Sequence, residues 1–214
     1  MATTRLKLYN SALFLLGERN LSSLSENRLP RRLLDHLWDN GVIDYCLEQK
    51  QWKFATRAVM LEADPSLEQD FGFQYGFVKP TDWLRTVAFA SDEYFDSPIE
   101  RYTDEAGYWF SETDPVYVKY VSNDSQFGGD LSLWPKSFEA YVAAHMAANV
   151  CLGLNQAETK KVALEKLADE LLRKAASKDA MDGPTGRLPS GSWTAARGGR
   201  GNAEGRGNKR ELIG

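Results

Sequence analysis

Apolar side chains recur with a helical period near the start of the chain. In residues 4–16 they form a stripe that ends at Gly17, a residue suited to a helix C-cap. A Ser- and Asn-rich stretch follows. From Asn27, a suitable N-cap, a long apolar face then continues to about Trp52. The pattern predicts two helices, with Gly41 marking a kink or a close contact within the second one.

The middle of the chain has a different pattern, in which aromatic residues alternate with turn sequences. ADPS, KPTD and ETDP are among the turns that recur at short intervals between residues 54 and 120. The clearest alternation is PVYVKYV, where Val116, Val118 and Tyr120 share one face and Val121 lies on the other. We predict short antiparallel strands at about 54–62, 84–91, 99–103, 107–111 and 116–121.

Helical spacing returns in the last part of the chain. An Ala-rich helix is predicted over 134–152, ended by Gly153, and a charged amphipathic helix over 156–180. The sequence therefore predicts an α+β fold, in which a four-helix bundle-like body carries an inserted antiparallel β region and an extended C-terminal arm. The expected parts are a helical bundle from 1–53 and 130–181, an aromatic-rich β insertion at 54–129, and the arm at 182–214.

Charge separates the arm from the rest of the chain. Of 214 residues 43% are hydrophobic, enough for a folded body, and the formal net charge is −4. Beyond Asp182 six basic residues face two acidic ones, a charge of +4, whereas the remainder, with 20 basic and 28 acidic residues, carries −8. The arm also holds nine of the 17 glycines. Alone it cannot offset an ordering entropy of about 1–2 kcal/mol per residue, so we expect it to be flexible.

The sequence offers little for catalysis. His36 and His145 lie on predicted helices, where a metal site with a carboxylate is conceivable but an ordinary helix histidine is far commoner. Cys46 and Cys151 have no CxxC spacing and are expected to be core thiols. The acidic run around Asp92 lacks EF-hand spacing. We expect no enzyme activity, no cofactor and no metal. The apolar stretch near the N-terminus is too short for a signal sequence or a membrane span, so no membrane association is expected.

The arm allows three interpretations. Its RGG and RGN steps are typical of a segment that binds RNA or DNA by neutralising phosphates. It can also be an unstructured linker, or a docking arm whose arginines meet acidic grooves of a partner while spaced apolar residues fill pockets. The basic residues are sparse for nucleic acid, and the apolar anchors favour a protein partner.

Three sequence features near the N-terminus follow one another in a characteristic order. A first helix ends in Leu15-Leu16-Gly17-Glu18, a Ser/Leu-rich loop covers 21–25, and a long helix closes on Trp52-Lys53-Phe54. Together they resemble tailed-phage head-to-tail adaptor proteins of the tail tubular protein A type, also called connector or gatekeeper proteins. A weaker similarity continues over 130–144, in which an acidic residue and Pro135 precede an aromatic and Ala-rich helix.

The resemblance implies a structural virion protein, assembled in the host bacterial cytoplasm and located at the head-tail junction. Its partners would be the portal protein, neighbouring copies in a ring of usually twelve, and a tail tube or nozzle protein. Double-stranded DNA would pass through the channel without sequence-specific binding. An acidic body is suited to such a channel, because a negatively charged wall does not attract the phosphates. The arm would reach the portal, although here it is longer and richer in Gly and Arg than in many members, so a neighbouring copy is an alternative partner.

Within the arm, Trp193 is the expected main anchor because the Gly, Ser and Thr residues around it give no local partner to bury it. Its truncation to Ala is expected to cost about 2 kcal/mol or more of docking free energy. The other expected docking residues are the cations and large apolar residues of the arm: Arg187, Leu188, Arg197, Arg200, Arg206, Lys209, Arg210, Leu212 and Ile213.

Overall fold

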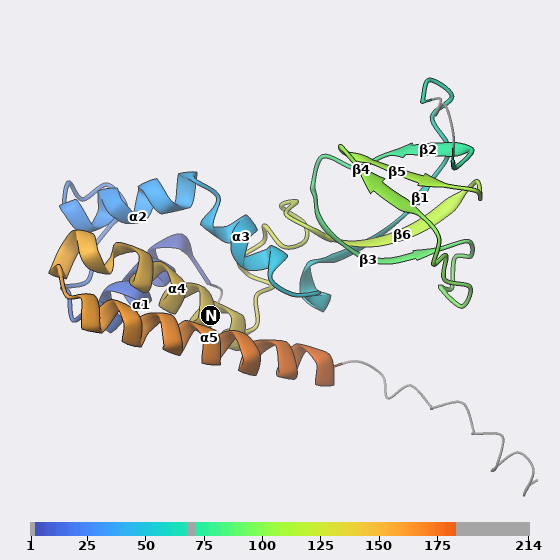
Figure 1. Cartoon of the computed structure of the whole chain (residues 1–214). Helices are drawn as coiled ribbons and strands as arrows, with labels where there is room; N and C mark the ends of the chain where they lie inside the picture. The colour runs from blue at the N-terminus through green and yellow to red at the C-terminus, as the bar shows by residue number, and fades with distance from the viewer. Residues whose placement is uncertain (1–2, 68–71, 183–214) are drawn as a thin grey trace, which may run out of the picture. The chain divides into compact units, whose positions relative to one another are not determined.

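The computed structural model describes residues 3–67 and 72–182, and it confirms a mixed α+β fold (Figure 1). Over these residues the chain forms five α-helices, one 3₁₀ turn and six strands. The helices are α1 (Arg5–Leu16), α2 (Leu29–Asp39), α3 (Val42–Glu48), α4 (Lys136–Asn155) and α5 (Glu158–Met181), with η1 at Lys53–Ala55. The strands are β1 (Thr56–Leu61), β2 (Tyr75–Val78), β3 (Trp83–Ala90), β4 (Thr103–Glu105), β5 (Tyr108–Ser111) and β6 (Val116–Ser122).

Helix α1 begins and ends as its sequence predicts. The Thr4 side chain accepts a hydrogen bond from the backbone N–H of Lys7, which satisfies one free donor of the first turn. Gly17 adopts a left-handed conformation, with φ of 72°, and its N–H bonds back to the last turn. At this end Asn155 donates to the Leu16 carbonyl at 3.1 Å, so that the ends of α1 and α4 meet.

The single long helix predicted between Asn27 and Trp52 is wrong. The structure divides it into α2 and α3, because Gly41 lies in the left-handed region with φ of 77° and ends the first helical segment. Asn27 is not the N-cap either. Arg28 occupies that position without a side-chain cap, and Pro30 lies in the first turn, where its missing N–H costs little.

Gly153 does not end α4, contrary to the prediction. The helix continues to Asn155, and Gln156 takes the left-handed position after it. A Cβ at Gly153 would lie 3.0 Å from a methyl carbon of Leu33, so the glycine makes room for α2 within the helix. Its role is a close helix contact, which the sequence pattern does not distinguish from a stop.

The strands form two three-stranded antiparallel sheets, ordered β1-β6-β3 and β2-β5-β4. The prediction missed β2, a four-residue strand, and placed β4 over 99–103, although the strand begins at Thr103. One backbone hydrogen bond links the segment after β1 to β2, since the N–H of Asp64 donates to the carbonyl of Gly76 at 2.8 Å. The pairing of β3 with β6 in the β1-β6-β3 sheet contains two register shifts, which are typical of β-bulges.

Strand β6 is fully buried on one face and, on the other, fully buried only at Val121, so it contributes to two hydrophobic cores. Val116, Val118 and Tyr120 point into the aromatic core between the sheets, as the alternation predicted. Val121, on the opposite face, joins the core of the helices. The β region thus packs directly against the helical body through one face of the β1-β6-β3 sheet.

Candidate partner-binding groove

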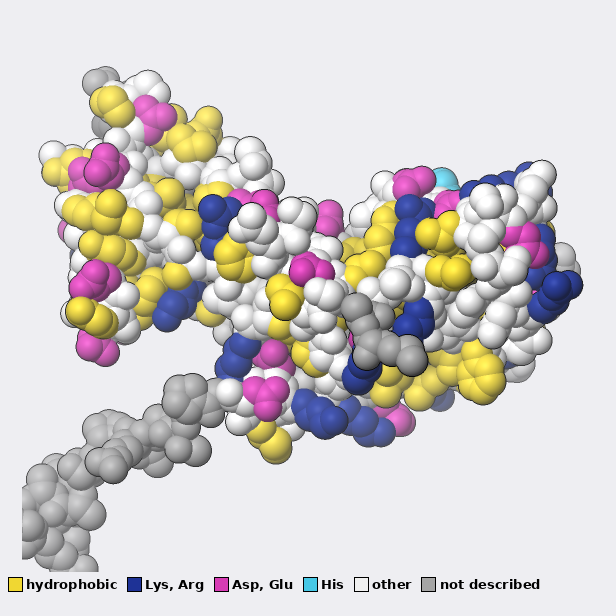
Figure 2. Space-filling model, turned by 180° about the vertical axis from the view of Figure 1, so that it is seen from behind, with side chains coloured by type: hydrophobic (Ala, Val, Ile, Leu, Met, Phe, Trp, Pro, Cys, Tyr) yellow, Lys and Arg dark blue, Asp and Glu magenta, His cyan; other side chains and the backbone are white. Residues whose placement is uncertain are grey.

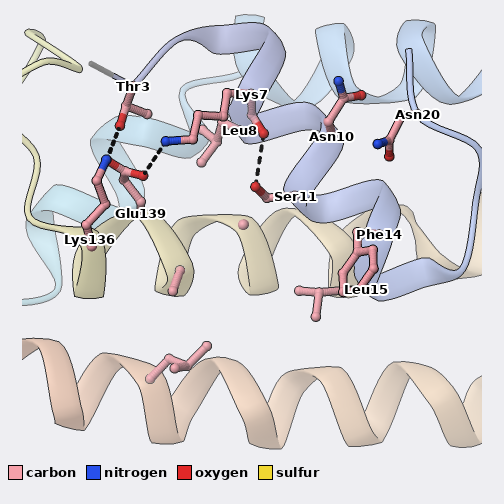
Figure 3. A pocket seen from close by; sticks show the side chains of 13 residues that line it. Thr3, Lys7, Leu8, Asn10, Ser11, Phe14, Leu15, Asn20, Lys136 and Glu139 are labelled. Carbon is pink, nitrogen blue, oxygen red and sulfur yellow. Dashed lines mark hydrogen bonds and ion pairs between the residues drawn. The ribbon is translucent and has the colours of Figure 1, made fainter. Parts of the chain in front are cut away.

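A groove of about 480 Å³ runs along α1 and α4 and reaches Leu171 of α5 (Figure 3). On α1, Lys7, Ser11 and Phe14 line it at a spacing of four and then three residues, which places them on one stripe of the helix. On α4 the lining stripe includes Ala140 and Ala143, whose small side chains form a shallow apolar floor.

One end of the groove is polar, and its charged groups pair with one another. Glu139 accepts hydrogen bonds from Thr3 and from Lys136, and its other oxygen lies 3.7 Å from the Lys7 ammonium (Figure 3). Lys136 also donates to the Thr3 hydroxyl at 3.2 Å. Because the Glu139 side chain is only 11% exposed, this cluster fixes the N-terminal ends of α1 and α4 to each other.

The other end of the groove is apolar and open. Phe14 exposes 77% of its surface beside the half-buried Leu15. Full burial of a Phe side chain contributes about 1.5–3 kcal/mol to the free energy of folding or binding. Most of the Phe14 side chain is exposed, so most of this contribution is available to a binding partner. Hydrophobic side chains also reach the surface elsewhere over the helical part, among Lys and Arg side chains (Figure 2). The groove is suited to hold an apolar side chain and has no free acid-base pair at its floor.

A smaller polar pocket of about 180 Å³ contains His145. Its ring stacks on Tyr45 of α3, with centroids 5.0 Å apart, and burial lowers the pKa of His145 while the Asp169 carboxylate opposes that shift. In residues 3–67 and 72–182 no group of three or more His, Cys, Asp and Glu side chains is placed to hold a metal ion. The residues that line this pocket come mainly from α3, α4 and α5, and the ring contact between Tyr45 and His145 packs α3 against α4.

The remaining candidate residues have ordinary structural surroundings. His36 is exposed on α2 and bonds to the Asn40 amide at 3.0 Å. Cys46 and Cys151 are buried free thiols, as predicted, and burial raises the pKa of Cys46 to about 12, which removes thiolate reactivity. Asp92 accepts backbone N–H bonds from Tyr94, Asp96 and Ser97, so it holds an exposed loop in shape.

The predicted docking residues of the arm, from Arg187 to Ile213, lie outside the described residues. The sequence pattern does not predict the groove residues, because most of the apolar stripe of the first helix faces the core and not the groove. Phe14 lies off that stripe and on the polar one, with Lys7 and Ser11. A large aromatic on a polar helix face is a sequence feature that could have indicated the groove.

Within the part of the chain that the structure covers, none of the helices combines the length and apolar character needed to cross a bilayer. No family model matches this chain, and no curated protein matches it.

Proposed function

We propose that this protein is a structural virion protein that forms the head-to-tail adaptor ring between a phage portal and the tail. One observation supports the proposal: several residues behind the resemblance to phage adaptors cap a helix or are buried in the core. Gly17 takes the left-handed cap of α1, and Leu21 is buried while its backbone bonds to Asn10. Trp52 is 1% exposed and packs on Phe138, with ring centroids 4.7 Å apart.

The helical body is compatible with the four-helix plan that the resemblance implies, if α2 and α3 count as one helix broken at Gly41. α1 and α4 lie side by side, α2 covers α4, and α5 closes the group (Figure 1). In this arrangement the Ala-rich α4 is the central helix, because its small side chains allow its neighbours to approach. The β insertion between α3 and α4 would face the tail side of the ring.

The arm would dock to the portal, and DNA would pass through the ring. The arm's formal charge of +4 and its apolar residues suit a protein surface with acidic grooves. The formal charge of −8 on the rest of the chain suits a channel wall along which DNA slides, since each neutralised phosphate would add attraction. A lumen lined mainly by Lys and Arg in the assembled ring would contradict this part of the proposal.

Electron microscopy of the full chain with its candidate portal, with and without residues 183–214, tests the proposal. We expect twelve-fold rings stacked on the portal only when the arm is present. Circular dichroism of the truncated chain would establish that the body remains folded. A monomer that ignores the portal and binds oligonucleotides with a steep salt dependence would instead support an RGG-type nucleic-acid-binding protein, the alternative that the arm's RGG steps favour.

A further inference from the structure

We propose that the groove along α1 and α4 receives the proximal part of the arm, residues 188–193, from a neighbouring copy, with the Trp193 side chain against the apolar end. The inference rests on the proposed function in one respect, namely that copies of the chain meet in a ring. It adds a docking site for the arm on this protein itself, next to the portal contact expected for the residues beyond Trp193.

The groove has the size and lining for a flat aromatic side chain. Its volume of about 480 Å³ falls in the range of about 300–1,000 Å³ typical of ligand sites in proteins. Ala140 and Ala143 leave the floor low, so an indole ring can approach the α4 backbone closely, and Phe14 stands beside it as an edge-to-face partner. The polar cluster around Glu139 is internally paired, so an incoming apolar side chain strands no charge there.

The arm has the matching composition. Trp193 stands between Ser192 and Thr194, with Gly191 before them, so no neighbour along the chain can bury its ring. Phe14, which is 77% exposed, leaves water in the proposed contact, and aromatic residues at the centre of an interface typically dominate its binding energy. At long range the arm's charge of +4 is attracted to the −8 of another copy.

The chain between Asp182 and Trp193 is long enough to span a distance comparable with the longest helix of the body. An extended chain advances about 3.3 Å per residue, so Trp193 can lie about 35 Å from Asp182. This distance is comparable with the length of α5, whose 24 residues span about 36 Å at 1.5 Å per residue. An arm that binds the groove of the next copy makes a head-to-tail contact, the type of contact that closes into rings.

Disulfide trapping between two full-length single variants tests the inference. Ser11→Cys places a thiol on the exposed groove face of α1, and Ser192→Cys places one beside Trp193, while the native Cys46 and Cys151 are buried. One variant is labelled with ¹⁵N, the two are mixed under mild oxidation with and without portal, and the linked species are identified by mass. We expect mixed dimers at least ten-fold above a control pair in which Ser25→Cys, on an exposed loop, replaces Ser11→Cys.

Trp193→Ala added to the Ser192→Cys chain should lower the yield of mixed dimers about ten-fold. Yields equal to those of the Ser25→Cys control, with and without portal, would overturn the inference. So would a Ser11→Cys/Ser192→Cys double variant that links only within one chain. Portal binding measured in the same samples separates the two proposals: rings on the portal without trapping leave the adaptor function standing, and trapping without portal binding leaves the groove contact standing.

Discussion

The backbone N–H of Lys53 donates to both carboxylate oxygens of Asp179, at 3.2 and 3.0 Å. The same lysine's ammonium group donates to the Ala180 carbonyl at 2.9 Å. The contact between Lys53 and Asp179 thus links the last turn of α5 to the segment directly before β1. Because Asp179 is only 9% exposed, the contact is largely shielded from water.

Asp179→Ala is expected to destabilise the body by about 1–3 kcal/mol, because it leaves the Lys53 N–H without its carboxylate acceptor. Urea denaturation measures the loss, and hydrogen exchange should become faster at Lys53 and in the last turn of α5. Lys178→Ala, at an exposed neighbouring position, is the control and should change stability by less than about 0.5 kcal/mol. Equal stability of the two variants would contradict the structural role of this contact.

Gly128→Ala is expected to be far more harmful than Gly107→Ala. A Cβ at Gly128 would lie 2.3 Å from the Ser122 carbonyl oxygen, so the backbone must shift, and Trp134 donates to the Gly128 carbonyl at 2.8 Å. At Gly107, with φ of 92°, a Cβ meets nothing within 4 Å, and only conformational strain of about 1–2 kcal/mol remains.

Thermal unfolding of both glycine variants measures the difference. We expect Gly128→Ala to lose about 3 kcal/mol or more, or to fail to fold. If Gly107→Ala proved the more damaging of the two, the close packing of Gly128 against β6 would be wrong.

The Asp82 carboxylate accepts hydrogen bonds from three side chains of the β1-β6-β3 sheet. It accepts from Arg57 at 3.0 Å, from Tyr120 at 3.1 Å and from the Ser122 hydroxyl. Burial acts to raise the pKa of Asp82, but the hydrogen bonds from Ser122, Arg57 and Tyr120 outweigh it and lower the pKa below its usual value. The ionised carboxylate is therefore the form that stabilises the fold.

Asp82→Asn should cost about 1–2 kcal/mol at pH 7, because its neutral amide accepts these hydrogen bonds less strongly. A lowered pKa in the folded state means that the stabilisation is complete above the unfolded pKa of about 3.9 and is lost as the pH falls through the folded pKa. The stability gap between wild type and variant should therefore shrink below about pH 4. Urea titrations at pH 7 and pH 3 check this, and an unchanged gap would count against the network.

His145 should titrate below the usual histidine pKa of about 6.5, because burial disfavours its charged form and Asp169 compensates only in part. The unfolded chain then binds more protons than the folded one as the pH falls below that value, so acidification weakens the fold. NMR titration in a His36→Gln background observes His145 alone, since the chain has two histidines. A His145 pKa above 6.5 would mean that Asp169 outweighs burial.

Local sequence patterns predict local structure well and glycine positions less well. The cap at Gly17 and the strand alternation of Val116, Val118 and Tyr120 are local properties, and the structure confirms both. The roles of Gly41 and Gly153 do not follow from the pattern, because a glycine within a helical pattern is compatible with a break, a stop or a close contact. The helix breaks at Gly41, which adopts a left-handed conformation, and continues through Gly153, where the absence of a side chain leaves room for Leu33.

By itself the sequence determined the fold class, most helices and strands, and the contrast between an acidic body and a basic arm, because these depend on periodicity and charge along the chain. Only the tertiary structure decided that Lys53 meets Asp179, that β6 serves two cores, and that Phe14 flanks a groove floored by Ala140 and Ala143. Each of these joins residues that are distant in sequence, and such pairings follow from how helices and sheets pack, which no local pattern encodes.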